Sequence, residues 1–173
     1  MVGIPTYGRS WTLTSSATDI GSPASGGGSG GNYTGEPGML GFNEICLYVR
    51  NYGWNVVKDP LVKIGPYAYK GNQWVGYDDV EMVAEKALYI LDNELGGAMF
   101  WDLSTDDFRG NCGQGRSPLI STVRDVLNEG ACPGLLLLLI HYIIHYYSYL
   151  NHFKSCSLSF FFLPSLLSYI RQN

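Results

Sequence analysis

One short segment limits the possible folds of this 173-residue chain more than any other. The segment LGGAMFWDLSTDDF, residues 95–108, passes from paired glycines through an apolar run to a tryptophan, and then to a group of aspartates. The run Ala98–Trp101 has the length and composition of a short buried strand. Trp101 would then stand at the end of a strand, where its large ring could either face a planar ligand or fill the core.

A helix and a second strand complete the pattern around this segment. Asp79 is a typical N-cap residue, and the apolar residues that follow it recur at helical spacing as far as Asn93. Met1–Ile4 predicts another short buried strand, and Ser117-Pro118 predicts the start of a last helix. A helix that joins two apolar strands is the βαβ signature of an α/β fold with parallel strands. One such unit cannot cover both faces of a sheet, so we expect residues 1–130 to form part of an α/β fold.

The segment between the first strand and the Asp79 helix is predicted to be a small unit of its own. Gly21–Gly38 (GSPASGGGSGGNYTGEPG) has too many glycines to pack and predicts a flexible surface loop. Leu40–Tyr52 is apolar at helical spacing and predicts a short helix. Lys63–Tyr69 and Asn72–Tyr77 predict two antiparallel strands joined by a tight turn.

The composition changes abruptly near residue 130. Residues 131–173 contain only Lys154 and Arg171 as charged residues, yet they hold all three histidines of the chain. Their longest apolar run is short for a membrane span, so a weak membrane anchor is the less favoured interpretation of this tail. We favour a segment that was never selected to fold. His141 and His145 have helical spacing for a metal, but no further ligand is spaced to assist them.

Charge and cysteine content exclude several functions. The formal net charge of -4 gives no basic surface for nucleic acid, so we expect no nucleic-acid partner. The four cysteines form no C-x-x-C pair, and no calcium-loop pattern occurs, so neither a metal nor another cofactor is expected. Cys46 and Cys112 could pair in an oxidising compartment, where the single sequon at Asn32 could also be glycosylated. No signal peptide stands at Met1, so the localisation stays open.

Three segments resemble the chitinases of glycoside hydrolase family 18. They are GIPTYGRSW (Gly3–Trp11), QWVGYDD (Gln73–Asp79) and the LGGAMFWDLSTDDF segment, in the family's order and at its spacing. The resemblance extends to about Glu129. It implies the C-terminal portion of a (β/α)₈ barrel, with strands seven and eight, and a small α+β domain inserted after strand seven at about residues 12–78.

The resemblance also implies a set of site residues. In such barrels the active site lies at the carboxyl ends of the strands, where Trp101 would form the apolar floor under the sugar at the cleavage point. Tyr7 and Arg9 would face the cleft and hydrogen-bond the sugar, Glu44 would close one wall of the groove, and Met99 would line the same pocket. The alternatives are structural: a core role for Trp101 and Met99, a solvated charge for Arg9, and an exposed helix carboxylate for Glu44.

Two further features follow from the resemblance. Cys46 and Cys112 match a pair that is disulfide-bonded in family members. Asp102, Asp106 and Asp107 depart in part from the family pattern, and we interpret them as loop and helix-cap carboxylates in preference to catalytic or metal-binding groups.

The principal catalytic acid of the family is missing from this sequence. Family 18 cleavage is substrate-assisted, because the sugar's own acetamido oxygen attacks the anomeric carbon, and it needs the Glu of an Asp-x-x-Asp-x-Asp-x-Glu run. No such run occurs here. We therefore expect a fragment of an extracellular chitinase that is inactive alone, with chitin or N-acetylglucosamine oligosaccharides as partners. The alternative is a non-catalytic, lectin-like chitinase homologue.

Overall fold

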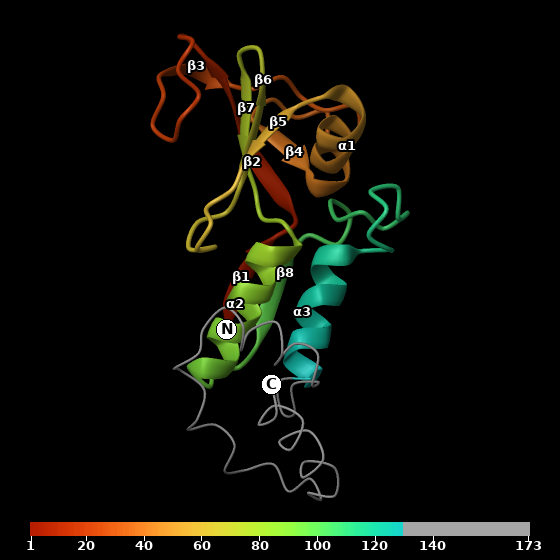
Figure 1. Ribbon diagram of the computed structural model, residues 1–173. Coiled ribbons are helices and arrows are strands. Elements are labelled where there is room, and N and C mark those ends of the chain that lie inside the picture. Colours follow the sequence, from red (N-terminus) through yellow and green to blue (C-terminus); the bar gives the residue numbers. More distant parts are fainter. Residues whose placement is uncertain (130–173) are drawn as a thin grey trace, which may run out of the picture. The chain divides into compact units, whose positions relative to one another are not determined.

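The computed structural model describes residues 1–129, which belong to one compact unit, Met1–Gly130 (Figure 1). The expectations for residues 131–173, including the anchor and the histidine pair, lie outside the described residues. Within the described part of the chain, no helix has both the length and the apolar character needed to cross a membrane.

Two parallel strands and two helices form the barrel portion that the sequence predicts. β1 (Val2–Pro5) pairs with β8 (Ala98–Trp101) in parallel register, so that Val2 lies opposite Ala98 and Pro5 opposite Trp101. α2 (Val80–Asp92) begins where expected, because the Asp79 side chain accepts a hydrogen bond from the Met82 backbone N–H at 3.0 Å. α3 (Pro118–Glu129) starts with its proline at the first helical position.

The helices cover only one face of this parallel pair. Ile4 is buried with Val83 and Ala87 of α2 and with Leu119 and Val123 of α3, and the alternate residues of β8 pack on the same cluster. Side chains alternate along a strand, so Gly3, Pro5, Met99 and Trp101 share the opposite face.

That second face is open, which corrects the prediction that Ala98–Trp101 is a buried strand. Met99 is 45% exposed and Trp101 is 64% exposed. Parallel strands are usually packed against helices or other strands on both faces, so their apolar composition predicts burial. In the described residues, helices pack against one face of this pair alone.

The inserted unit is a six-stranded antiparallel sheet with one helix. Its path is β3-β2-β7-β6-β5, and β4 also pairs with β2. The strands are β2 (Tyr7–Leu13), β3 (Ala24–Gly27), β4 (Met39–Gly41), β5 (Asn55–Val57), β6 (Tyr67–Lys70) and β7 (Gln73–Gly76). The predicted hairpin is therefore confirmed as β6 and β7. The sheet begins at Tyr7, and the insertion bounds of about 12–78 stay a prediction.

This unit has its own small core. α1 (Phe42–Tyr52) confirms the predicted helix, and its Ile45 is buried with Leu40, Ala68 and Val75. Gly8 of β2 is required here, because a Cβ at this position would lie 2.6 Å from Val75 Cγ2 and 2.8 Å from Ile45 Cδ1.

The expectation that Gly21–Gly38 is an unpacked loop is wrong for Ala24–Gly28. β3 lies in this segment and pairs with β2, and the Gly28 N–H donates to the Ser10 carbonyl at 3.0 Å. The glycines permit close backbone contact: a Cβ on Gly27 would lie 2.9 Å from the Gly38 Cα. A segment of this composition can form a flexible linker or a tightly paired strand. Here the backbone of β2 provides the partner, so the segment forms a strand.

Candidate functional site

Tyr7 and Arg9 lie on one face of β2, the strand that follows β1 directly along the chain. Gly8 and Ser10 alternate with them and are buried on the other face. The Arg9 guanidinium carbon lies 5.1 Å from the centre of the Tyr7 ring, a cation–π contact that orients both groups. The structure therefore brings together two of the residues that the sequence selects.

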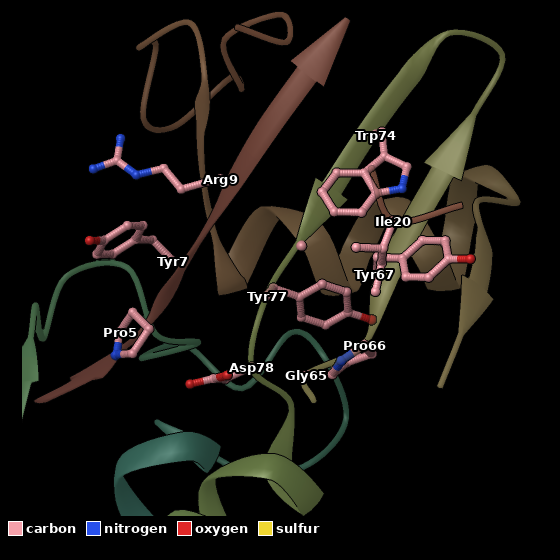
Figure 2. Close-up of a pocket in the computed structure, with 11 residues that line it drawn as sticks. Pro5, Tyr7, Arg9, Ile20, Gly65, Pro66, Tyr67, Trp74, Tyr77 and Asp78 are labelled. Carbon is pink, nitrogen blue, oxygen red and sulfur yellow. The ribbon is translucent and has the colours of Figure 1, made fainter. Parts of the chain in front are cut away.

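An open pocket of about 360 Å³ adjoins these two residues. Figure 2 shows Tyr7 and Arg9 on one side of it, with Trp74 and Tyr67 on the other. Tyr67 and Trp74 stack with their ring centres 5.2 Å apart. The pocket is lined by Pro5, Tyr7, Arg9, Ile20, Gly65, Pro66, Tyr67, Trp74, Gly76, Tyr77 and Asp78.

Trp101 and Met99 lie outside this pocket, and Trp101 adjoins it through Pro5. Pro5 lines the pocket and is also the strand partner of Trp101, and paired residues of parallel strands point to the same face. The Trp101 ring is largely exposed there. Within the described residues it leaves an aromatic surface open beside Pro5.

Three pocket or neighbouring residues were not predicted as site residues. Met39 of β4 lies directly opposite Arg9 in the sheet, and only the register reveals this. Asp78 accepts an ion-paired hydrogen bond from Lys86 and is mostly buried in the pocket wall. Burial raises the pKa of Tyr77 to about 12, with the Asp79 carboxylate adding to the rise, so this phenol stays neutral at ordinary pH.

Glu44, which is expected to close one wall of the groove, is not among the residues that line the pocket beside Tyr7 and Arg9, and its role at the groove stays a prediction. Glu44 is only 6% exposed, so it is not the exposed helix carboxylate of the alternative interpretation. Its Oε1 accepts from the Tyr33 N–H at 2.5 Å, and its Oε2 accepts from the Gly41 N–H at 3.0 Å and the Thr34 hydroxyl at 2.8 Å. Both oxygens are thus engaged in tying the loop before α1 to the start of that helix.

The aspartates beyond Trp101 act as loop and helix-cap groups, as predicted. Asp106 accepts from the Ile120 N–H of α3 at 3.1 Å, and burial raises its pKa while that bond opposes the shift. Asp102 accepts from the Ser104 hydroxyl at 2.6 Å, which lowers the pKa of Asp102. Asp107 accepts from the backbone N–H groups of Asn111 and Cys112 at 3.0 and 2.7 Å.

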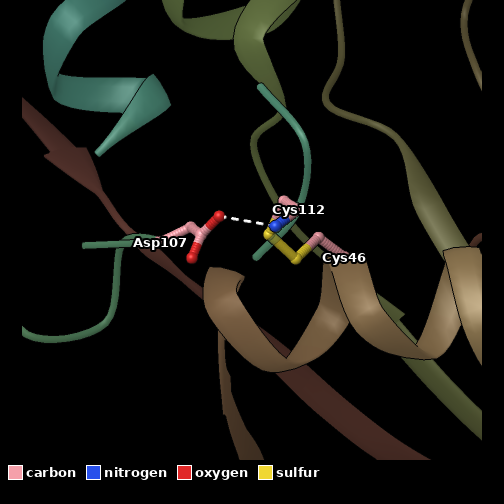
Figure 3. A group of neighbouring side chains, drawn as sticks. All are labelled: Cys46, Asp107 and Cys112. Atoms are coloured by element: carbon pink, nitrogen blue, oxygen red, sulfur yellow. Dashed lines mark hydrogen bonds between the residues drawn. A yellow bond between two sulfur atoms is a disulfide. The ribbon is translucent and has the colours of Figure 1, made fainter. Parts of the chain in front are cut away.

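Cys46 and Cys112 form the expected disulfide, with their Cα atoms 5.7 Å apart (Figure 3). The bond joins α1 of the inserted unit to the loop that follows β8. Asp107 lies beside the two sulfur atoms, and in residues 1–129 this trio is the only group of three or more His, Cys, Asp or Glu side chains close enough to share a metal ion. Because the sulfurs are bonded to each other, they are not thiolate ligands, and the trio does not form a metal site.

The side chains of this surface can contact a ligand in two ways. Exposed aromatic rings offer flat faces to the C–H bonds of a sugar ring, and Arg9 supplies hydrogen-bond donors for hydroxyl or carbonyl oxygens. The one carboxylate among the pocket-lining residues, Asp78, is held by Lys86.

Comparison with known proteins identifies the family. The sequence profile of Glycosyl hydrolases family 18 matches residues 1–106. The chain is 46% identical over 130 residues to Chitinase-3-like protein 2 of Homo sapiens, covering 75% of this chain and 33% of that protein. It is 42% identical over 130 residues to Probable chitinase 10 of Drosophila melanogaster, covering 75% of this chain and 6% of that protein.

Solved structures agree with the sequence comparison. The catalytic domain 2 of the Ostrinia furnacalis Group II chitinase superposes with a TM-score of 0.73 at 45% identity, over 74% of this chain and 34% of that one. Human YKL-39 gives a TM-score of 0.69 at 44% identity, over 74% and 35% of the two chains. This chain thus spans a third or less of the curated relatives described above. The open strand pair, the inserted sheet and these matches together show that the chain belongs to glycosyl hydrolase family 18.

Proposed function

We propose that this chain contributes an oligosaccharide-binding surface of a chitinase or chitinase-like protein, with oligomers of β-1,4-linked N-acetylglucosamine as the ligand. One observation carries the proposal. Trp101 presents an open ring on the uncovered face of the β1–β8 pair, and Tyr7 and Arg9 follow directly beyond its strand partner Pro5. An aromatic platform beside a fixed cation suits a sugar with an acetamido group.

The ligands of similar proteins support this ligand class. A mutant of the Ostrinia furnacalis domain was crystallised with an N-acetylglucosamine oligomer, and human YKL-39 is described as a pseudo-chitinase with retained chitooligosaccharide binding properties. One relative is thus named as a chitinase, and the other binds the oligomer without being a true chitinase. The surface described above is compatible with a chitinase and with a protein that only binds the oligomer.

We further propose that these residues bind the oligomer but do not cleave it by themselves. The sequence contains no Asp-x-x-Asp-x-Asp-x-Glu run, and Asp78, the carboxylate in the pocket, is committed to Lys86. Substrate-assisted cleavage still needs an acid to protonate the leaving oxygen. A non-catalytic, lectin-like role is therefore the second candidate, and the Trp101 surface serves both.

An oxidising, extracellular location is part of the proposal. The Cys46–Cys112 disulfide supports it, because such bonds form and persist mainly outside the reducing cytosol.

Isothermal calorimetry with the chitin tetramer tests the binding proposal. The purified full chain should bind the tetramer, and Trp101→Ala should weaken binding by roughly tenfold or more. Tyr89→Ala is the matched control, since Tyr89 is an exposed aromatic on α2 away from this surface. Equal affinity in the wild type and the Trp101 variant would contradict the proposal. Release of shorter sugars from the tetramer by the homogeneous chain would contradict the non-cleaving part alone.

A further inference from the structure

A second pocket lies around the start of α1 and shares no residue with the first. Its volume is about 220 Å³. Three segments meet there: the loop before β4, α1, and the loop after β8. The lining residues are Asn32, Tyr33, Asn43, Glu44, Leu47, Tyr48, Tyr52, Asp107, Phe108, Arg109 and Asn111.

Buried carboxylates hold the two loops of this pocket in place. Glu44 accepts the N–H groups of Tyr33 and Thr34, at 2.5 and 3.2 Å. Asp107 accepts the N–H groups of Asn111 and Cys112, and Cys112 is bonded to Cys46 of α1. The walls are therefore set by the fold before any ligand arrives, which reduces the entropy lost on binding.

The walls carry aromatic rings that remain open to solvent. Tyr33 and Phe108 lie with ring centres 6.0 Å apart at 48°, and both are exposed. Tyr52 is exposed as well and contacts Tyr48 edge to face, with ring centres 6.0 Å apart. Arg109 lies over the Phe108 ring at 5.3 Å. Rings of this kind with amide and guanidinium donors beside them are suited to a sugar ring.

The chain supplies an attachment point for a sugar at this pocket. Asn32-Tyr33-Thr34 is the single N-x-Ser/Thr sequon of the chain, and Asn32 is both exposed and part of the lining. Because Asn32 lines the pocket, a sugar joined to its Nδ2 atom would begin next to the pocket.

We propose that Asn32 carries an N-linked glycan and that the first N-acetylglucosamine of this glycan packs into the second pocket, against Tyr33 and Phe108. The donor is a lipid-linked diphospho-oligosaccharide of the secretory pathway. The bond from sugar C1 to the diphosphate oxygen breaks, a bond from C1 to Asn32 Nδ2 forms, and Nδ2 loses one proton. The diphosphate leaves with the bonding electron pair. This inference is independent of the oligosaccharide-binding proposal, because the two pockets share no residue.

Secretion and mass spectrometry test the attachment. The full chain is expressed in a eukaryotic host behind a cleavable leader, and its intact mass is measured before and after peptide N-glycosidase treatment. The wild type should lose a glycan mass on treatment. Asn32→Gln should show none, whereas Thr34→Ser keeps both the sequon and a hydroxyl for Glu44 and should match the wild type. A secreted wild-type chain without a glycan would overturn the proposal.

The rate of glycan removal from the folded protein tests the packing. Contact with the pocket should shield the first sugar, so Phe108→Ala should be cleaved roughly fivefold faster than the wild type under native conditions. Tyr52→Ala should change the rate in the same direction, and Tyr89→Ala on α2 should leave it unchanged. After denaturation all variants should be cleaved at one rate. Equal native rates in the wild type and in both folded pocket variants, checked by thermal unfolding, would overturn the packing.

Discussion

The inserted sheet and the barrel strands differ in how completely they are covered. The inserted sheet packs Leu40, Ala68 and Val75 against Ile45 of α1 and so buries its own apolar face. The β1–β8 pair has helices on one face only, and Trp101 is 64% exposed on the other. The inserted sheet thus buries its apolar side chains, whereas the β1–β8 pair leaves one face exposed. Within the described residues, the candidate site lies on and beside this exposed face.

The largest effect is expected from removing the disulfide that joins α1 of the inserted unit to the loop after β8. The Cys46–Cys112 bond spans 66 residues, and losing it in the double serine variant should lower the free energy of unfolding by about 4 kcal/mol. Urea unfolding followed by circular dichroism measures this change, and the reduced wild type is the control. A loss below about 1 kcal/mol would mean that the bond scarcely restricts the unfolded chain.

A matched pair of core variants tests whether the regions are separate units. Ile45→Ala in the inserted core and Leu119→Ala in the barrel core each remove a fully buried side chain, at an expected cost of about 3 kcal/mol. Amide hydrogen exchange should accelerate mainly in β2, β6 and β7 for the first variant, and mainly in β1 and β8 for the second. Equal acceleration everywhere in both variants would show one cooperative unit and remove the distinction.

Tyr77 packs against both cores, and the pH dependence of stability should show how firmly its phenol is buried between them. Burial raises its pKa to about 12, above the unfolded value of about 10. Its protonated form therefore stabilises the fold fully below about pH 10, and this contribution is lost as the pH rises toward 12. Tyr77→Phe should reduce the alkaline loss of unfolding free energy by about 2 kcal/mol, measured from pH 7 to 11.5. Parallel stability curves for the two proteins would contradict this assignment.

The smallest effect on stability is expected at Trp101. Because its ring packs little, Trp101→Ala should change the free energy of unfolding by no more than about 0.5 kcal/mol. Trp54→Ala is the contrast, since Trp54 stacks on Tyr48 at 5.3 Å beside the inserted core and should cost at least about 1.5 kcal/mol. Similar losses in thermal unfolding for the two variants would mean that the β1–β8 face is covered in solution.

The helices and strands that depend on a few neighbouring residues could be predicted from the sequence. The Asp79 cap, the strand Ala98–Trp101 and the β6–β7 hairpin each follow from a local pattern of capping, apolar residues or turn residues. The Cys46–Cys112 bond followed from the family resemblance, and the structure confirms it.

The features that could not be predicted from the sequence depend on distant contacts. A glycine-rich segment can form a flexible loop or a closely paired strand, and only the presence of a partner strand decides between them. For this reason β3 was not predicted. The hydrogen bonds of Glu44 to the N–H groups of Tyr33 and Thr34 could not be predicted either, because they depend on how the loop before β4 meets α1. Exposure of Trp101 depends on what covers a sheet face, which an apolar run cannot indicate.

The most direct test of the proposed binding surface follows the tryptophan indole N–H signals in a ¹H–¹⁵N spectrum. Single tryptophan-to-phenylalanine variants assign the signals of the four tryptophans. On titration with the chitin tetramer, the Trp101 signal should move the most, while that of Trp54, packed on Tyr48, should stay in place. A Trp101 signal that does not move while the tetramer binds would contradict the account.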